Sequence, residues 1–314
     1  MPPHRHVLPS HARPARLASA GRADADYGRG DAPDWRGVPW RASLRAVTIG
    51  GRRVHVADIG AGAGAPALFI HGLGGRWQNW LENIPRIALE RRVVAFDLPG
   101  FGRSQMPAEP ISIPGYAAVV DRLCDLLELD AAVVVGNSMG SFVAAELALR
   151  HPARVARIAL VSAAAVSIGD FNPVPASALL GLLTRTPLGT PVGMRAVLAR
   201  RRARHLAFAA VIRHPTRIAT DTLAELAAGR GAPGLASALS AMIEHDIRRE
   251  LHRIAVPALI VHGREDMLVP VADSVWLAGQ LPDATIEIFD DTGHLAMVER
   301  PIRFNASLLR FAAA

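Results

Sequence analysis

A serine, a histidine and an aspartate in this sequence occur in contexts that suit nucleophilic catalysis. Ser138 lies in "VVVGNSMG", a G-x-S-x-G pattern that directly follows an apolar run. A serine hydroxyl becomes an effective nucleophile when a base accepts its proton, and His294 in "FDDTGHLAMVERP" is the best candidate. Asp266 in "LIVHGREDMLVP" would fix the histidine tautomer and stabilise the imidazolium. The sequence therefore predicts a catalytic triad of Ser138, Asp266 and His294, in the chain order expected for a serine on a strand-to-helix turn.

Other side chains compete for these roles. Glu265 directly precedes Asp266 and is the nearest rival for the acid, while Asp290 and Asp291 are more remote alternatives. Among the 12 histidines, His71 attracts attention because it ends the apolar run in "PALFIHG". We expect His71 to shape the following loop through structural hydrogen bonds rather than to act as the base.

The oxyanion that develops during acyl transfer needs hydrogen-bond donors near the serine. The N–H group of Met139, the residue after Ser138, is one expected donor, and Leu73 in "HGLGG" is the other. Each such donor stabilises the transition state by about 3 kcal/mol. The backbone at this loop can approach a substrate carbonyl closely because glycines surround Leu73, namely Gly72, Gly74 and Gly75.

A sharp strand-to-helix turn would place Ser138 at the carboxyl edge of a sheet. The run "AAVVVG" is typical of a buried strand, and "MGSFVAAELALR" is typical of a helix. Gly136 and Gly140 flank the serine, and we expect that a Cβ at either position would clash in so tight a corner. The start of the helix adds unpaired N–H groups and a positive dipole end beside the hydroxyl.

Strand-like runs and helical patterns alternate along most of the chain, which predicts a parallel sheet with right-handed crossovers. The alternation stops near residue 163, only helical patterns follow, and strand signals resume with "VPALIVHG". We expect a disordered basic arm over residues 1–40 and one sheet domain in two parts, 41–163 and 248–314. A helical insertion over residues 164–247 would separate the two parts.

Composition limits the remaining function classes. The 314 residues carry a formal net charge of +7, but the arginine excess is divided between the arm and "RAVLARRRARH". We therefore expect solvated faces and no nucleic-acid partner. No apolar run suits an integral membrane segment, and residues 1–30 lack the apolar core of a secretory signal, so we expect a cytoplasmic protein. The single cysteine, Cys124, lies in an apolar helical pattern and is expected to fill the core.

Five segments together resemble the α/β-hydrolase superfamily, in its branch with a helical cap. They are "HGLGG", "DLPGFGRS", "GNSMG", "GREDMLVP" and "GHLAMVERP", and the likeness extends from about residue 44 to residue 314. The resemblance implies an α/β-hydrolase fold: a mostly parallel eight-stranded sheet flanked by helices, with the cap inserted after strand 6. It also implies a Ser-His-Asp triad with no cofactor and no metal. The family's nucleophile, acid and base map to Ser138, Asp266 and His294, and its oxyanion donors to Leu73 and Met139.

Two features of the motifs bear on the reaction. A serine at the elbow differs from the aspartate of haloalkane dehalogenases and epoxide hydrolases of this fold, and so indicates acyl-transfer chemistry. Ser141 stands where many relatives have a second glycine after "SMG", and we expect its larger side chain to narrow the site.

The resulting hypothesis is a serine hydrolase that cleaves a small or medium carboxylic ester through an acyl-enzyme. The alternative is a carbon–carbon bond hydrolase of the meta-cleavage-product type, which acts on vinylogous diketones and which "GNSMG" also resembles. Such relatives usually use a cap arginine for the substrate carboxylate, and the helical insertion offers several, including Arg185, Arg195, Arg200 and Arg213.

Two hypotheses come from other classes. One is a ligand-binding receptor or scaffold on a hydrolase fold, although such proteins often lose a member of the triad. The other is an arginine-rich helix that binds an anionic membrane surface. In every enzymatic reading the partner is a small-molecule substrate.

Overall fold

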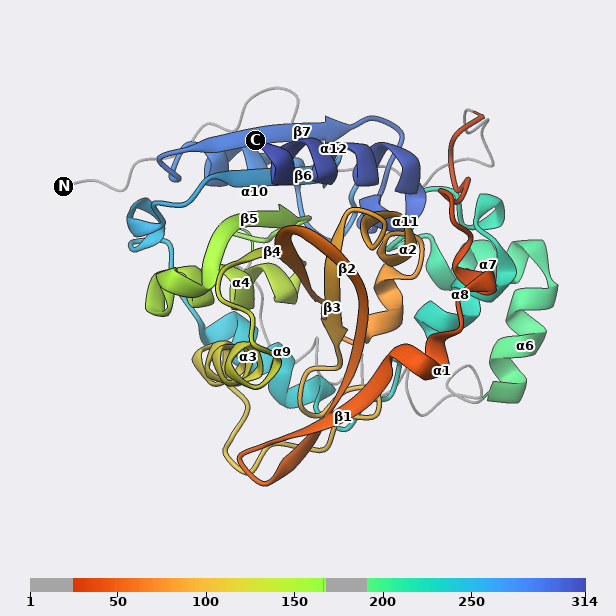
Figure 1. Ribbon diagram of the computed structural model, residues 1–314. Coiled ribbons are helices and arrows are strands. Elements are labelled where there is room, and N and C mark those ends of the chain that lie inside the picture. The colour runs from red at the N-terminus through yellow and green to blue at the C-terminus, as the bar shows by residue number, and fades with distance from the viewer. Residues whose placement is uncertain (1–24, 166, 168–190) are drawn as a thin grey trace.

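The fold is built on one mixed, mostly parallel sheet (Figure 1). The structure is a computed structural model, and it describes residues 25–165, 167 and 191–314. Within these residues, seven strands pair in the order β1-β2-β4-β5-β6-β7, with β3 beside β2. β1 runs antiparallel to β2, residues 56–59 of β2 pair antiparallel with β3, and the other neighbouring strands run parallel. The strands are β1 (Leu44–Ile49), β2 (Arg52–Ile70), β3 (Arg91–Phe96), β4 (Ala132–Asn137), β5 (Val155–Val161), β6 (Ala258–Gly263) and β7 (Ala284–Phe289).

The seven labelled strands agree with the expected sheet of eight, because β2 contains two runs that pair with different neighbours. Residues 52–59 of β2 pair with β1 and β3, whereas residues 67–70 pair with β3 and β4. The first run pairs antiparallel with β3, from Val56 opposite Phe96 to Ile59 opposite Val93, and the second pairs parallel with it, from Ala67 opposite Val93 to Ile70 opposite Phe96. The two runs therefore border opposite edges of β3 as two strands, joined through a glycine-rich stretch. Counted in this way, the helical segment between β5 and β6 follows the sixth strand run, as expected.

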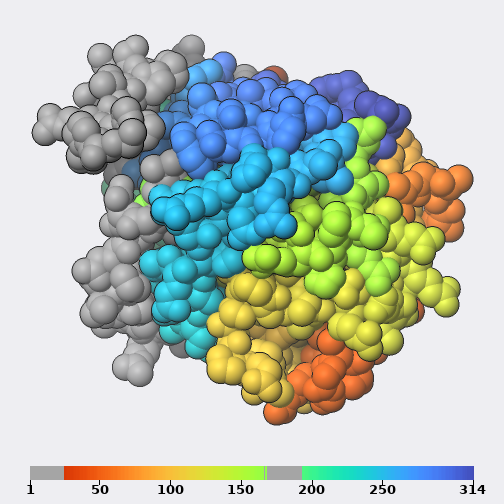
Figure 2. Space-filling model, turned by 90° about the vertical axis from the view of Figure 1, so that its left-hand side faces the viewer, coloured from red at the N-terminus to blue at the C-terminus, as the bar shows by residue number. Residues whose placement is uncertain are grey.

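Alternate side chains of the central strands point to opposite faces of the sheet. On one face, Leu68 and Ile70 of β2 and Val134 of β4 belong to one hydrophobic core. The outer surface of this face is visible in Figure 2, where the yellow, green and blue segments lie side by side. The helices that pack here are α3 (Ile113–Leu127), α4 (Met139–Arg150), α9 (Leu235–Glu244) and α10 (Val271–Ala278).

The opposite face carries a second core. Phe69 of β2 and Val133 and Val135 of β4 point into it. These residues alternate along their strands with the residues that point into the first core. Both faces are therefore covered, as the continuous apolar runs predict. The helices on this side are α2 (Ile84–Ile87), α6 (Pro191–Ala199), α7 (Arg201–Phe208), α8 (Thr220–Ala227), α11 (Ala296–Glu299) and α12 (Pro301–Ala313).

The segment between β5 and β6 is helical wherever the structure describes it. Residues 191–253 form α6 to α9 and two short 3₁₀ helices, η6 (Pro215–Arg217) and η7 (Leu251–Arg253), and contain no strand. The helical pattern expected at residues 176–183 lies outside the described residues. Because β5 and β6 are parallel neighbours, this segment leaves and rejoins the sheet at adjacent strands.

Residues 25–40, which were expected to belong to a disordered arm, are folded onto the protein. From residue 25 onwards the chain packs on the body of the protein beside α7 and α8 (Figure 1). Tyr27 is 3% exposed and belongs to the second core, and the indole of Trp35 donates to Glu82 at 3.0 Å. The expectation is wrong here because these aromatic side chains find buried partners that the low-complexity composition does not reveal. A short helix, α1 (Trp40–Ser43), follows.

Other expectations concern single features. Cys124 is fully buried on α3, as predicted for a core residue. In the described part of the chain, no helix has the length and hydrophobicity needed to cross a bilayer. The same residues contain no cluster of three or more His, Cys, Asp or Glu side chains arranged to hold a metal ion.

Candidate active site

Ser138 occupies a strained turn between β4 and α4. It has φ 51° and ψ −117°, and α4 begins at the next residue, Met139. A positive φ at a residue with a Cβ costs on the order of 1–3 kcal/mol, so neighbouring contacts must hold it. The N–H of Ser138 donates to the carbonyl of Val161 on β5 at 2.8 Å, and the N–H of Ser141 donates to the Ser138 carbonyl at 2.9 Å. The predicted strand-to-helix turn is therefore present, with a half-buried serine at its tip.

The two glycines that flank the serine, Gly136 and Gly140, occupy positions where a Cβ would clash, as predicted. A Cβ on Gly136 would lie 2.2 Å from the carbonyl oxygen of Gly140. A Cβ on Gly140 would lie 2.3 Å from the carbonyl oxygen of Ile70, at the end of β2. Both contacts are with backbone, which cannot move aside as a flexible side chain would, so the expected clash is confirmed at both positions.

His294 and Asp266 form a buried pair at the carboxyl edge of the sheet. Asp266 follows β6 and His294 follows β7, and Nδ1 of His294 lies 2.7 Å from Oδ2 of Asp266. The other carboxylate oxygen, Oδ1, accepts the backbone N–H groups of Leu268 at 2.8 Å and Val269 at 3.0 Å. These bonds fix the carboxylate so that one oxygen faces the imidazole. The pairing leaves Nε2 of His294 as the nitrogen that can exchange a proton with another group.

Each partner shifts the pKa of the other. Burial alone would lower the pKa of His294, but the charge and hydrogen bond of Asp266 outweigh it and raise this pKa. Burial alone would raise the pKa of Asp266, but His294 and the further histidine His262 lower it well below its usual range. The arrangement therefore favours an ionised carboxylate beside an imidazole that readily accepts a proton.

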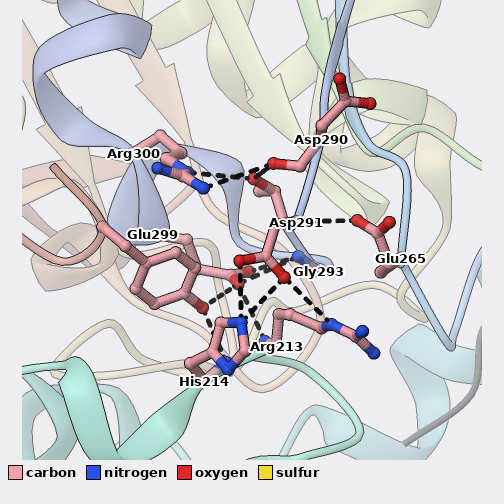
Figure 3. Close-up of polar contacts among 10 residues, drawn as sticks. Arg213, His214, Glu265, Asp290, Asp291, Gly293, Glu299 and Arg300 are labelled. Atoms are coloured by element: carbon pink, nitrogen blue, oxygen red, sulfur yellow. Dashed lines mark hydrogen bonds and ion pairs between the residues drawn. The ribbon is translucent and has the colours of Figure 1, made fainter. Parts of the chain in front are cut away.

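The rival acids have other partners. Glu265 accepts the backbone N–H of Thr292 at 3.0 Å through Oε2. Asp290 pairs with the guanidinium of Arg264, and Asp291 contacts the ring of His214, as Figure 3 shows. Of the four acids considered from the sequence, Asp266 is the one that hydrogen bonds to His294.

Ser138 is placed beside the loop that contains Leu73. A Cβ on Gly72 would lie 3.2 Å from the Cβ of Ser138, so the backbone of this loop passes directly against the serine. Met139, as the first residue of α4, has an N–H without an intrahelical acceptor. The serine therefore borders both the loop that contains Leu73 and the first residue of α4, and the roles of Leu73 and Met139 as oxyanion donors stay a prediction. Within the described residues, the hydroxyl of Ser138 makes no hydrogen bond.

His71 holds this loop in place, as predicted. It is completely buried, its Nε2 accepts the backbone N–H of Leu98 at 3.0 Å, and its Nδ1 lies 2.8 Å from the carbonyl of Gly72. Burial lowers the pKa of His71, which favours the neutral ring that can make both bonds at once. The prediction of a structural role is confirmed.

Ser141 was expected to narrow the site, but its side chain is buried against the turn. Its side chain is 2% exposed, and its hydroxyl donates to the carbonyl of Gly136 at 2.8 Å. The hydroxyl thus braces the turn from within α4. Of the arginines singled out in the sequence, Arg185 lies outside the described residues and Arg195 and Arg200 are exposed. Arg213 is half-buried, with Nε 3.4 Å from Asp291.

Sequence reasoning missed two side chains that support the pair. Nε2 of His262 lies 3.2 Å from the Asp266 carboxylate, and its Nδ1 lies 2.6 Å from the hydroxyl of Ser274. Glu299 lies five residues after His294 in the same "GHLAMVERP" segment and is fully buried. Its carboxylate accepts backbone N–H groups of the loop that carries His294 (Figure 3). His262 could have been found from its position on the strand that precedes Asp266. Glu299 resembles an ordinary helical surface residue in the sequence.

Comparison with known proteins places the chain in a family. The family model described as alpha/beta hydrolase fold matches residues 66–301. This span is more than half of the chain, and it includes the serine turn and the histidine–aspartate pair. The chain belongs to the α/β-hydrolase family, and the resemblance stated from the sequence motifs is confirmed.

Two characterised relatives indicate the range of activities among similar sequences. A 2-hydroxymuconate semialdehyde hydrolase from Pseudomonas sp. (strain CF600) is 33% identical over 283 residues, 84% of this chain and 92% of the relative. A 3-oxoadipate enol-lactonase 2 from Acinetobacter baylyi (strain ATCC 33305 / BD413 / ADP1) is 30% identical over 244 residues, 77% and 87% of the two chains.

A solved structure supports the same fold. Est816, described as an N-acyl homoserine lactone degrading enzyme, superposes with a TM-score of 0.68 at 28% identity. The match covers 85% of this chain and 100% of Est816.

Proposed function

We propose that this protein is a serine hydrolase that cleaves a carbon–carbon bond beside a carbonyl, in a substrate of the meta-cleavage-product type. The observation that carries the proposal is the pairing of Asp266 with His294 at the sheet edge where Ser138 stands on its strained turn. The choice of substrate class is supported by the 33% identity to a 2-hydroxymuconate semialdehyde hydrolase. The alternative from the sequence is therefore favoured over simple ester hydrolysis.

The proposed reaction has two halves, formation of an acyl-enzyme on Ser138 and its hydrolysis by water. His294 accepts the proton of Ser138, whose oxygen adds to the substrate carbonyl carbon. The backbone N–H groups of Leu73 and Met139 bind the resulting oxyanion, and Asp266 stabilises the imidazolium. The carbon–carbon bond then breaks, its electron pair is delocalised over the conjugated dienoate, and this fragment takes up the proton held by His294, which returns the imidazole to its neutral form. Water, activated by His294, finally releases the carboxylic acid from Ser138.

Arg213 is the proposed ligand for the carboxylate of such a substrate. It follows α7, next to the segment whose Val211 carbonyl accepts the N–H of His294 at 3.1 Å. This backbone contact keeps Arg213 near the base. An Arg213→Gln variant should raise KM for a dienoate substrate by about tenfold, because one charged hydrogen bond to the substrate carboxylate is lost. The same variant should leave KM for a neutral ester unchanged.

The proposal is tested by comparing substrates with purified protein. We expect kcat/KM for 2-hydroxymuconate semialdehyde to exceed that for p-nitrophenyl acetate. Ser138→Ala should lower kcat by about 10⁴ to 10⁶. Ser307→Ala is a matched control that should retain activity, because it removes a buried hydroxyl on α12 that donates to Glu287 on β7. Equal turnover by Ser138→Ala and wild type would refute serine catalysis.

Ester or lactone hydrolysis is the second candidate function. It is supported by the enol-lactonase relative and by the similarity to Est816, at 30% and 28% identity. It uses the same groups, except that an alkoxide leaves instead of a carbanion and accepts its proton from His294. An N-acyl homoserine lactone or a p-nitrophenyl ester that is turned over much faster than the dienoate would favour this candidate.

A further inference from the structure

We propose that Tyr27, from the N-terminal segment, is a positioning residue for the base. Its hydroxyl completes the donor set around Glu299, the buried carboxylate that holds the loop carrying His294. The inference rests on the proposed function of His294, and it adds to that function a part of the chain that lies far outside the sequence motifs.

Glu299 organises the backbone on both sides of His294. Its Oε2 accepts the N–H of Gly293 at 2.9 Å, and its Oε1 accepts the N–H of Leu295 at 3.2 Å. Oε2 also accepts the N–H of Arg213 at 2.8 Å, from the helical segment between β5 and β6. One carboxylate therefore fixes the residues before and after the base and ties them to a third segment (Figure 3).

The hydroxyl of Tyr27 is a further donor to this carboxylate. It donates to Oε2 of Glu299 and accepts the backbone N–H of His214 at 2.8 Å. Burial and the charge of Glu299 raise the pKa of Tyr27, so the hydroxyl keeps its proton and can donate. Tyr27 thus links Glu299 to the helical segment through a second route.

Three consecutive residues of the N-terminal segment dock at this place. The Asp26 carboxylate lies 3.6 Å from the guanidinium of Arg300, and the N–H of Gly28 donates to the Glu299 carbonyl at 2.8 Å. The guanidinium of Arg300 also lies 5.0 Å from the centroid of the Tyr27 ring, within the range of a cation–π contact. Gly28 has φ +67°, and a Cβ there would lie 2.8 Å from the carbonyl of Arg217. So specific a set of contacts indicates a built docking site for residues 26–28.

The charge of Glu299 connects this docking site to the chemistry. Burial raises the pKa of Glu299, and the Tyr27 hydroxyl together with the backbone donors opposes that rise. The negative charge of Glu299 in turn adds to that of Asp266 in raising the pKa of His294. Among the described residues, the charged or titratable side chains at or next to this cluster include Asp26, Tyr27, Arg213, His214, Asp291, His294 and Arg300.

The test compares Tyr27→Phe with a matched control, Tyr116→Phe. The two tyrosines are the only ones in the chain, both are buried at 3% and 2% exposure, and the Tyr116 hydroxyl donates to the carbonyl of Pro99 at 3.1 Å. We would measure kcat, KM and the pH dependence of kcat/KM with p-nitrophenyl acetate, or with the dienoate if that is turned over faster. Fluorophosphonate labelling of Ser138 would be followed in parallel.

For Tyr27→Phe, kcat should fall about tenfold, while KM should stay within about twofold of wild type. The expected fall corresponds to the loss of the charge-assisted hydrogen bond from Tyr27 to Glu299, which positions His294. The acid limb of kcat/KM should move to lower pH, because Glu299 without its hydroxyl donor holds its charge less well and supports the imidazolium less. Tyr116→Phe should change neither quantity. Asp26→Asn, at a residue on the surface, should give the same pattern with a drop of about threefold and serves if Tyr27→Phe does not fold.

The outcomes separate the two proposals. If wild type is labelled at Ser138 and active, but Tyr27→Phe and Asp26→Asn match Tyr116→Phe in kcat and pH profile, the positioning role is refuted and the proposed function stands. If wild type shows no activity that depends on Ser138 and no labelling, the proposed function fails and the role of Tyr27 fails with it.

Discussion

Replacing Asp266 by asparagine should reverse the tautomer of His294. Oδ1 of Asp266 accepts two backbone N–H groups at 2.8 and 3.0 Å, so the amide oxygen of an asparagine would occupy that side. The amide NH₂ would then face Nδ1 of His294, now 2.7 Å from a carboxylate oxygen. Nδ1 would have to accept a hydrogen bond, which moves the ring proton to Nε2. The nitrogen that should receive the serine proton would already carry one.

The expected loss is about 10⁴ in kcat, or roughly 5 kcal/mol of transition-state stabilisation. The backbone bonds to the side chain remain, so the protein should stay folded, with a loss of about 1–3 kcal/mol in the free energy of unfolding. Steady-state kinetics would measure kcat, urea unfolding the stability, and ¹⁵N NMR of labelled histidine the tautomer.

Asp273→Asn is the matched control for this experiment. Asp273 is 4% exposed against 5% for Asp266, and it accepts the backbone N–H of Ala165 at 2.7 Å. It has no histidine partner among the described residues, so kcat of Asp273→Asn should stay close to wild type. A folded Asp266→Asn protein whose kcat lies within tenfold of wild type would refute the role assigned to the Asp266–His294 pair.

Three further outcomes follow from the same contacts. Because Asp266 raises the pKa of His294 despite burial, and catalysis needs the neutral ring, kcat/KM should fall with acid through a pKa above the ordinary value of about 6.5; a midpoint below 6 would contradict this. Gly140→Ala places a Cβ 2.3 Å from the carbonyl of Ile70, so urea unfolding should show a loss of about 3 kcal/mol or more, and wild-type stability would count against the clash. Burial raises the pKa of Cys124 to about 11, so a thiol reagent should label the native protein far more slowly than the guanidinium-unfolded chain.

The parts of the site that the sequence predicts are those that local patterns encode. Two glycines at fixed distances from Ser138 specify a turn that only a few backbone conformations can satisfy, and the structure has that turn. Asp266 and His294 each follow a strand-like run, so a parallel sheet brings both to one edge. Such inferences need only strand direction and short spacing.

The parts that the sequence does not predict depend on long-range packing. Tyr27 and Glu299 are 272 residues apart and hydrogen bond through side chains whose neighbours look like a polar arm and a surface helix. No periodicity relates two such positions, so composition wrongly indicates disorder from residue 25 onwards.

The path of β2 has a consequence for how the sheet assembles. Because the two runs of β2 border β3 on opposite edges, the pairing of β1, β2 and β3 uses residues 44–96 alone, with partners close in sequence. The later parallel pairs each require a distant crossover and a larger loss of chain entropy. Amide hydrogens of β3 should therefore gain protection early in refolding, as part of a nucleus onto which the strands bearing the serine, aspartate and histidine are added afterwards.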